Sequence, residues 1–403
     1  MKRSALRALV IPTLLCVAAC TVGTVDPVDD QRAAATPKPK VQEPAGGAPA
    51  PTPATKCATD LGPELARLIV PGLSAGIIKD GKLVCTAVAG LADIEGNRPV
   101  TPDTVFAWAS VSKTVTSVTL MSLFDEGKLR LDDPIDAHVS FRVRAPACAS
   151  TPLTLRHLLT HTSSIIDGDA YDDSYADGDS PIALGDFLRS YLVAGGARYD
   201  AADNFGPGCP GTAYEYSNVA TALAAYAAES ITKVPFDQLA RERVFQPLGM
   251  NETSFRLRDL DLSRVARPYE RTGTTFTAIP HIGYPTYPDG LVRTSVPQLA
   301  RFLAMFSNGG ELDGKRILAA STVAEMQKLQ VPALDDSQGL IWYFDTFGTR
   351  TVLGHDGADP GTSGHMYFDP KDGAGVLLVA NGEWDDDAAE ALLAKLFAES
   401  ENY

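Results

Sequence analysis

Hydrophobic and polar residues recur with two different periods along the chain, and each period predicts one kind of element. After residue 110 the apolar positions Val111, Val115 and Val118 follow the spacing of a helix, for which Gly127 is a typical end. Apolar runs bounded by Gly or Asp-Gly are typical of strands, as on both sides of residues 79–82 and four times between residues 340 and 381. Further helices are expected at 58–70, 153–162, 219–231, 235–246, 296–307, 321–329 and 386–400. The pattern predicts strands near both ends of the chain and mostly helices between them.

The first twenty residues have the pattern of an export signal. Residues 1–7 are basic and residues 8–19 are apolar, a combination typical of a secretory signal and too short to span a membrane. The segment ends in Val17-Ala-Ala-Cys20, which resembles the lipobox of bacterial lipoproteins. Residues 1–19 are therefore predicted to be a signal peptide, with Cys20 as the lipidated first residue of the mature chain. Ordinary cleavage beside an unmodified cysteine is the alternative.

The next segment, residues 20–57, is rich in Pro, Ala, Thr and Gly and shows no apolar periodicity, which predicts an extended tether. Residues 58–403 are long enough to enclose a large core. Cleavage removes three of the 35 Lys and Arg residues, so that 32 remain against 50 acidic residues, a formal charge of −18. Because nucleic-acid binding needs clustered cations, nucleic acid is not expected as a partner.

Four cysteines remain in the mature chain apart from Cys20. An even number in an exported protein predicts disulfides, although three connectivities are open. We expect Cys57–Cys85, which would tie the start of the domain to an early strand, and Cys148–Cys209, which would join two loops. A metal site ranks far lower because the sequence contains no Cys-x-x-Cys pair, and no metal is predicted.

A serine and a lysine stand three residues apart at the start of the helix that follows residue 110. Positions i and i+3 share one face of a helix, so the Lys113 amine can lie beside the Ser110 hydroxyl. A partly desolvated lysine can lose its proton near neutral pH and activate the serine as a nucleophile. The spacing alone is weak evidence, since a chain of this length contains about one such pair by chance.

Two further polar groups occur at element boundaries. Tyr216-Ser-Asn218 precedes an Ala-rich helix, where a phenol could transfer protons and an amide could bind a substrate carbonyl. A polar helix cap is the alternative. His355-Asp-Gly357 ends a predicted strand, and Gly357 would let a ligand approach the backbone closely.

Other polar clusters favour structural roles. His157 and His161 have a spacing that can bind zinc, but residue 158 is Leu and no third ligand is evident, so structural histidines are expected. The Asp-rich residues 167–180 lack the pattern of an EF-hand loop and are expected to form a solvated surface loop.

The three motifs, in this order, resemble those of the serine β-lactamase and penicillin-binding-protein superfamily, closest to the branch of class C β-lactamases, D-alanyl-D-alanine carboxypeptidases and related esterases. The similarity extends from about residue 62 to residue 400. It implies an α/β (α+β) fold whose antiparallel sheet, flanked by helices, is built from both chain ends, with an inserted all-helical lobe. The expected lobes are 58–110 with 290–403 for the α/β part and 111–289 for the helical part, with the active site between them.

The resemblance also implies residue roles. Ser110 would be the acylated nucleophile, with Lys113 and Tyr216 sharing the general-base work. Asn218, His355 and Gly357 would position the substrate. The backbone N–H groups of Ser110 and Ala358 would form the oxyanion hole. No metal or organic cofactor is implied.

The third motif departs from the family pattern at Asp356, where a hydroxyl residue is usual. If this carboxylate faces the cleft, it would repel a substrate carboxylate and favour esters or amides over penicillins and D-Ala termini. The leading hypothesis is an exported, lipid-anchored serine hydrolase of the cell envelope that forms an acyl-enzyme with an ester or amide, as an esterase, amidase or carboxypeptidase, with β-lactamase activity also open. The alternative is a non-hydrolytic penicillin-binding or sensing lipoprotein. The sequence leaves the oligomeric state open.

Overall fold

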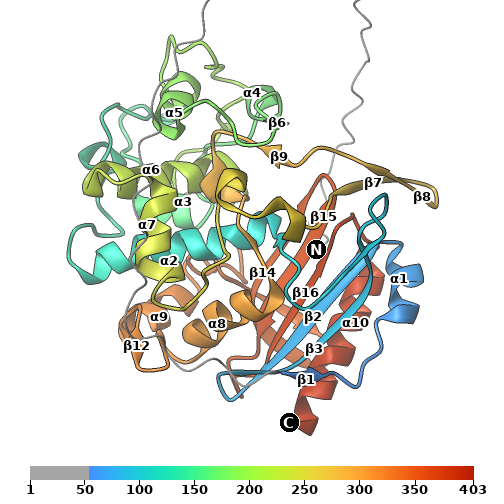
Figure 1. The fold of residues 1–403 in the computed structure, drawn as a ribbon. Helices are drawn as coiled ribbons and strands as arrows, with labels where there is room; N and C mark the ends of the chain where they lie inside the picture. Colours follow the sequence, from blue (N-terminus) through green and yellow to red (C-terminus); the bar gives the residue numbers. More distant parts are fainter. Residues whose placement is uncertain (1–53) are drawn as a thin grey trace, which may run out of the picture. The chain divides into compact units, whose positions relative to one another are not determined.

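A large sheet built from both ends of the chain forms the frame of the protein (Figure 1). The computed structural model describes residues 54–403, so the predicted signal peptide, the lipidation site Cys20 and most of the tether lie outside the described residues. The strands follow in the order β1-β3-β2-β16-β15-β14-β13, and β4 pairs with β3. Their bounds are β1 (Thr55–Lys56), β2 (Gly72–Lys79), β3 (Lys82–Asp93), β4 (Arg98–Pro99), β13 (Tyr343–Phe347), β14 (Arg350–Asp359), β15 (Thr362–Phe368) and β16 (Gly375–Ala380).

The strand pairing explains how the two chain ends combine. Neighbouring strands are antiparallel, apart from the short parallel pair β1–β3. Strand β16 pairs with β2, with Leu378 opposite Ala75, which joins the last strand to the first long one. The tight turn at Asp80 and Gly81 connects β2 to β3 through two residues with positive φ (49° and 70°), as the Asp-Gly sequence predicts.

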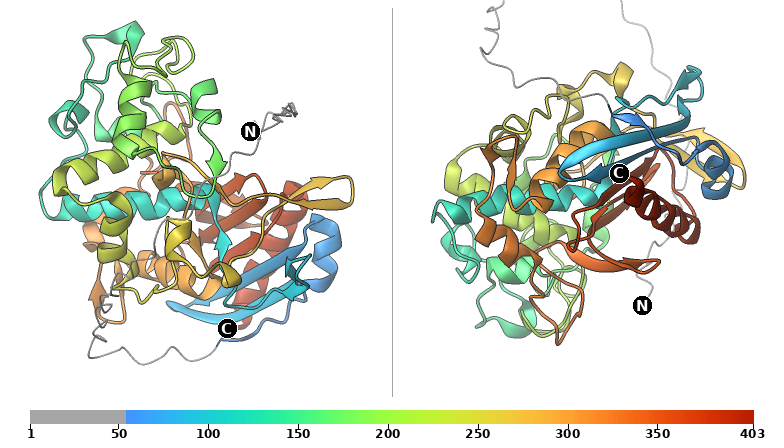
Figure 2. Two further views of the ribbon diagram at one scale, coloured as in Figure 1. Left: turned by 45° about the horizontal axis from the view of Figure 1, so that its top comes forward. Right: turned by 90° about the horizontal axis from the view of Figure 1, so that it is seen from below.

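Both faces of the sheet are buried, and alternate residues of each strand enter different cores. Leu378 packs in the core beneath α1 (Gly62–Leu68) and α10 (Asp386–Glu399), whereas Leu377 packs in the larger core on the opposite face. Helix α8 (Val296–Ser307) covers that opposite face, as Figure 2 shows from below. The sheet is therefore the middle layer between two sets of helices.

Helix α2 (Ser112–Asp125) lies at the centre of the helical part, and all of its residues from Ser112 to Leu123 are buried. Several of them are Ser or Thr, whose hydroxyl groups donate to backbone carbonyls. Thr119 donates to Val115 O at 2.8 Å and Thr116 to Pro288 O at 2.6 Å, so these polar residues can be buried. Around α2 lie the 3-10 turn η1 (Ala109–Val111) and α3 (Leu155–Leu159), α4 (Asp169–Asp172), α5 (Leu184–Leu192), α6 (Asn218–Thr232), α7 (Phe236–Ala240) and α9 (Ala320–Gln327).

The resemblance implies an all-helical inserted lobe, but the inserted segment also contains short strands. β7 (Tyr269–Thr272) and β8 (Thr275–Ala278) form a hairpin, and β6 (Ala176–Asp177) pairs with β9 (Ile282–Gly283). The hairpin forms because Gly273, with φ +63°, closes a tight turn between two short extended segments. The chain returns to the sheet through β10 (Arg293–Thr294), which pairs with β5 (Phe106–Ala107).

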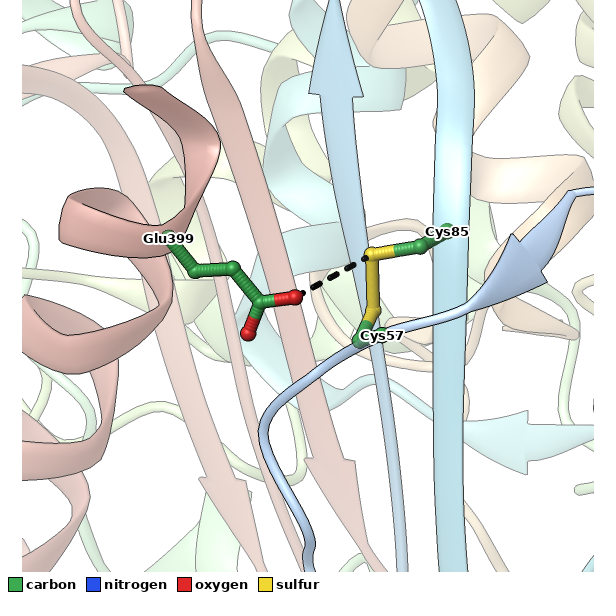
Figure 3. Close-up of side chains that lie close together, drawn as sticks. All are labelled: Cys57, Cys85 and Glu399. Carbon is green, nitrogen blue, oxygen red and sulfur yellow. Dashed lines mark hydrogen bonds between the residues drawn. A yellow bond between two sulfur atoms is a disulfide. The ribbon is translucent and has the colours of Figure 1, made fainter. Parts of the chain in front are cut away.

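Two disulfides are present, Cys57–Cys85 and Cys148–Cys209, with the connectivity expected from the sequence. The first lies beside Glu399, whose carboxylate accepts hydrogen bonds from the backbone N–H groups of Ala58 at 2.6 Å and Thr59 at 2.8 Å. Figure 3 shows Glu399 Oε1 at 4.0 Å from Cys85 Sγ; because a disulfide sulfur carries no proton, this is a packing contact. The disulfide fixes residue 57 to β3, and Glu399 fixes residues 58 and 59 to the C-terminal helix.

Residues 54–403 contain no helix with the length and apolar character needed to cross a membrane.

Candidate active site

Ser110 and Lys113 meet where α2 begins. Ser110 lies in the 3-10 turn η1, and Lys113 lies in the first turn of the helix. Lys113 Nζ donates a hydrogen bond to Ser110 Oγ at 2.8 Å and another to the backbone oxygen of Asp289 at 2.9 Å. The Lys113 side chain is fully buried, whereas Ser110 is partly exposed. A buried amine therefore contacts a hydroxyl group that a substrate can reach.

The turn that presents Ser110 is fixed by the sheet. Ala109 has a φ of 44°, a left-handed conformation that costs a non-glycine residue about 1–2 kcal/mol. Strand β14 packs on this turn so closely that a Cβ at Gly357 would lie 2.6 Å from Trp108 O and 2.7 Å from Ser110 N. Only glycine fits at position 357, and the close approach brings β14 next to the backbone nitrogen of Ser110.

The surroundings of Lys113 favour its neutral form. Burial lowers the pKa of the Lys113 amine, against opposing contributions from acidic side chains, of which Asp289 is the strongest and Asp356 the weakest. Asp289 is itself buried, and burial raises the pKa of its carboxyl, which the neighbouring Lys113 amine opposes. The lysine can therefore lose its proton more easily than an exposed lysine, as a general base near a serine requires.

Tyr216 reaches the same hydroxyl from the start of α6. Its phenol lies close enough to Ser110 for that hydroxyl to influence its pKa, and Lys113 Nζ lies 5.0 Å from the centre of its ring. The ring is 39% exposed. Desolvation of the hydroxyl raises the pKa of Tyr216 well above 10, and the neighbouring Ser110 opposes this only in part, so the phenol is neutral.

The Tyr216 segment is fixed by two residues from before α4. Asp167 accepts hydrogen bonds from Ser217 Oγ at 3.1 Å and from the backbone N–H groups of Asn218 at 2.8 Å and Val219 at 3.0 Å. His161 Nδ1 accepts the N–H of Ser217 at 3.2 Å, and its ring lies 4.4 Å from the Tyr216 ring. Asp167 and His161 therefore set the position of Tyr216.

The sequence offered two interpretations of Tyr216-Ser-Asn218, a polar helix cap and a catalytic or binding role, and these concern different residues. Ser217 is the helix cap, since its side chain accepts the N–H of Ala220 at 3.0 Å. Asn218 is the first helical residue and is half-buried. The Asp-rich residues 167–180 do not form a simple solvated loop: they contain α4 and β6, and Asp179 accepts two further backbone N–H groups.

The third motif presents alternate residues to opposite faces of β14. His355 and Gly357 face the core that contains α2, because they pair with Met366 and Gly364, whereas Asp356 pairs with His365 on the α10 face. The ring centres of His355, which is 2% exposed, and Tyr216 lie 6.2 Å apart.

Asp356 is held at the edge of the sheet. Its carboxylate accepts a hydrogen bond from the Tyr343 hydroxyl at 2.5 Å and lies 3.6 Å from His355 Nδ1. The acidic residue on the same face as Gly357 is Asp359, two positions further along β14. Asp356 is exposed and acts electrostatically on Lys113 and Tyr216, so its effect on substrate choice stays a prediction, and Asp359 is a second acid to consider.

The two histidines considered for zinc do not form a site together. His157 caps α3 with Thr154, and His161 supports Tyr216. Within residues 54–403, a geometry suited to a metal ion occurs at Cys57, Cys85 and Glu399, where the two sulfurs are already joined in a disulfide.

Sequence reasoning missed the roles of Asp167, His161, Asp289 and Asp359. Asp289 gives no local signal, because Pro288-Asp-Gly290 is typical of a turn. Asp359 stands directly beyond the third motif, and continuing the alternation of the strand past Gly357 would have indicated the face on which it lies.

The comparisons with known proteins agree with this geometry. A family model described as Beta-lactamase matches residues 62–399. Penicillin-binding protein 4 of Amycolatopsis lactamdurans is 28% identical over 326 residues, which cover 78% of this chain and 81% of that protein. D-alanyl-D-alanine-carboxypeptidase/endopeptidase AmpH of Escherichia coli (strain K12) is 26% identical over 285 residues, 69% of this chain and 71% of that protein.

A solved structure gives the same result for the fold. The octameric penicillin-binding protein homologue from Pyrococcus abyssi superimposes with a TM-score of 0.68 and 25% identity, over 83% of this chain and 75% of that chain. With a family match over most of its length, the chain belongs to the beta-lactamase family and is a serine hydrolase.

Proposed function

We propose that this chain hydrolyses an ester or amide bond through an acyl-enzyme formed on Ser110. The observation that carries the proposal is the 2.8 Å contact between Ser110 Oγ and the Nζ of a fully buried Lys113. Because burial lowers the pKa of Lys113, the neutral amine can accept the proton of the serine hydroxyl at the moment of attack. Lys113 is therefore the general base.

The reaction balances with these groups alone. Ser110 Oγ attacks the substrate carbonyl carbon and its proton passes to Lys113 Nζ. The neutral phenol of Tyr216 then gives its proton to the leaving alcohol or amine as the C–O or C–N bond breaks, and it regains a proton from Lys113, which returns to its neutral form. A water molecule next attacks the acyl-enzyme and gives its proton to Lys113. Ser110 takes a proton back as the acid product leaves.

The remaining site residues bind and polarise the substrate. The backbone N–H groups of Ser110 and Ala358 form the oxyanion hole, an assignment supported by the close packing of β14 on the turn before Ser110. Gly357 lets β14 approach Ser110 closely, and we assign substrate binding to Asn218 and to His355, whose ring centre lies 6.2 Å from that of Tyr216.

The charges around Ser110 favour neutral or cationic substrates. Asp289, Asp167 and Asp359 all lie near enough to Lys113 to influence its pKa, so the site carries a negative field. This field disfavours the carboxylate of a penicillin or a D-Ala terminus and supports an esterase or amidase. Cleavage of peptides that end in D-alanine, suggested by the names of the relatives, ranks second.

The cellular place of the enzyme is also part of the proposal. The signal-like first 19 residues and Cys20 support export and lipid anchoring at the cell envelope, with the domain held off the membrane by the tether. Mass spectrometry of the mature N-terminus tests the anchor, since an unlipidated Cys20 would contradict it.

Intact-mass spectrometry of the folded protein tests the chemistry. The protein is exposed separately to a fluorophosphonate, a penicillin and an activated ester, beside Ser110→Ala and the control Ser117→Ala, a buried serine on the same helix. A stoichiometric adduct in the wild type and the control, absent in Ser110→Ala, is the expected result. No adduct with any reagent in folded protein would instead favour a non-hydrolytic binding or sensing protein, and a stable adduct with penicillin alone would favour a penicillin-binding role.

A further inference from the structure

Asp359 lies on the same face of β14 as Gly357. Residues of one strand that are two positions apart lie on one face and about 7 Å apart, and Gly357 packs against the turn that carries Ser110. Ala358, whose N–H group belongs to the proposed oxyanion hole, is the residue between them. The Asp359 carboxylate therefore lies a few bonds beyond the place where the reacting carbonyl of a substrate would be bound.

Two phenols fix this carboxylate without neutralising it. Tyr175 donates to Oδ1 at 2.9 Å and Tyr284 donates to Oδ2 at 3.0 Å. The pKa values of both tyrosines are raised well above 10, first by burial, so both are neutral donors. The Tyr284 hydroxyl can reach Asp359 only because residue 290 is glycine, where a Cβ would lie 1.9 Å from that hydroxyl. Several contacts thus converge to hold one acidic side chain in place.

The carboxylate has capacity for a further partner. Among residues 54–403, no Lys, Arg or His nitrogen lies within ion-pair distance of Asp359. Asp359 and Tyr175 are both partly exposed, so a small cation in solution can reach them. A carboxylate offers about four lone-pair positions, and the two phenols occupy two of them. Burial raises the pKa of Asp359 to about 6, which leaves it mainly ionised at neutral pH.

The two cations of residues 54–403 that act on Asp359, Lys113 and Arg293, are both buried and already bonded to other groups. Arg293 lies behind Asp359 but is only 1% exposed. Its guanidinium donates to the backbone oxygens of Phe255, Leu291 and Ile282. Lys113 is fully buried and bonded to Ser110. The groups that can meet a ligand beside β14 at this position are therefore a fixed carboxylate and the partly exposed Tyr175, an acid and an aromatic ring of the kinds that attract a cation.

We propose that Asp359, with Tyr175, forms a subsite for a protonated amine of the substrate, so that the enzyme prefers esters or amides that carry a free amino group a few bonds from the scissile carbonyl. This proposal rests on the proposed function, because it assigns the substrate class of the Ser110 site. An ammonium group would bond the free lone pairs of Asp359 and lie against the Tyr175 ring. A substrate carboxylate at the same place would be repelled.

Matched substrates test the subsite. The amide and methyl ester of phenylalanine, as both enantiomers, are compared at pH 7 with those of 3-phenylpropanoic acid, which lacks the amine, and of N-acetylphenylalanine, in which the amine is not charged. The expected wild-type result is a kcat/KM at least about 10-fold higher for the compounds with a free amine. In Asp359→Asn the ratio between amine and desamino substrates should fall about 10- to 100-fold, the range expected for losing a charged hydrogen-bond partner. The control Asp173→Asn removes an exposed acid from the neighbouring α4 segment and should leave the ratio as in the wild type.

A second measurement needs no variant at all. The cationic 2-phenylethylamine should inhibit the wild type competitively at concentrations where the neutral 2-phenylethanol does not. Equal inhibition by the two compounds, or an unchanged substrate ratio in folded Asp359→Asn, would overturn the subsite while leaving Ser110 hydrolysis in place. If no compound is hydrolysed and no fluorophosphonate adduct forms on Ser110, the proposed function fails and the subsite with it.

Discussion

Asp167 accepts a hydrogen bond from the backbone N–H of Asn218 at 2.8 Å, although the two residues are 51 positions apart in the chain. The same carboxylate binds the Val219 N–H and the Ser217 hydroxyl, so one side chain satisfies the free donors at the start of α6. A negative charge at a helix N-terminus is also stabilised by the helix dipole. The catalytic position of Tyr216, which directly precedes this helix, therefore depends on an acid from a different part of the chain.

Replacing Asp167 by Asn should reduce both stability and turnover. The Asn side chain has one acceptor oxygen in place of two, so at least one of the N–H groups at residues 218 and 219 loses its partner. We expect a loss of about 1–3 kcal/mol in the free energy of unfolding and a lower kcat. Urea denaturation and steady-state kinetics measure the two effects, with the exposed Asp169→Asn as control. Unchanged kcat in a destabilised variant would mean that Asp167 supports the helix without positioning Tyr216.

Lys113→Met should reduce both activity and stability. Methionine fills a similar volume but cannot accept a proton, so kcat/KM should fall by about 10²- to 10⁴-fold, as for loss of a general base. Stability should fall as well, because methionine removes the hydrogen bond to the Asp289 backbone and leaves the buried Asp289 carboxyl without its amine, so activity is measured on protein shown to be folded. Kinetics and thermal unfolding are compared with Lys82→Met, an exposed lysine in the β2–β3 hairpin. Activity within a few-fold of the wild type in Lys113→Met would exclude Lys113 as the base.

Tyr216→Phe should affect poor leaving groups more than good ones. If the neutral phenol relays a proton to the leaving group, its loss matters most for an amide or alkyl ester and least for a p-nitrophenyl ester, which leaves without protonation. The ratio of kcat/KM between the two kinds of substrate measures this. The control is Tyr214→Phe, since the Tyr214 hydroxyl donates to Gln338 at 3.2 Å. An equal loss for both kinds of leaving group would contradict proton relay by Tyr216.

The pH dependence of kcat/KM should show the influence of the acidic residues around Lys113. Activity needs the neutral amine, so kcat/KM should rise with pH through the Lys113 pKa, which burial lowers and the Asp289 charge raises. Asp289→Asn removes that charge, so the acid limb of the profile should move to lower pH. Asp356→Asn should move it in the same direction by less, because Asp356 contributes least among the acids that act on Lys113. A shift to higher pH in Asp289→Asn would contradict this assignment.

The sequence predicted most of the local structure and the family. The period of the apolar residues predicted α8 at residues 296–307, where the structure has it, and the turn at Asp80 and Gly81 was predicted by residue type. These elements are decided by neighbouring residues, so a local pattern is sufficient. The resemblance of the three motifs to β-lactamases and penicillin-binding proteins is confirmed by the family match over residues 62–399.

The parts that the sequence could not predict depend on contacts between distant segments. Lys113 meets Asp289 across 176 positions, and nothing near either residue indicates the other. Which of Asp356 and Asp359 lies on the same face as Gly357 depends on the alternation of residues along β14. An error of one residue in that alternation moves a side chain to the opposite face. Burial decides the pKa of Tyr216, so its chemical character also follows from the fold and not from its motif.

The Cys57–Cys85 disulfide and the hydrogen bonds of Glu399 should contribute to stability and not to catalysis. Cys57 and Cys85 are 28 positions apart, and a disulfide that closes such a loop stabilises by about 3–4 kcal/mol through the unfolded state. Cys57→Ala/Cys85→Ala should lose about this free energy of unfolding, and Glu399→Gln about 1.5–3 kcal/mol, as expected for hydrogen bonds to a charged group. The disulfide holds residue 57 to β3 and Glu399 holds residues 58 and 59 to α10. Because both ties secure the same short segment, the combined variant should lose less than the sum of the two. Because α10 covers the face of the sheet opposite Ser110, kcat of each folded variant should equal that of the wild type. Denaturant titrations and steady-state kinetics test both statements, and a fully additive loss would mean that the disulfide and Glu399 act on separate parts of the fold.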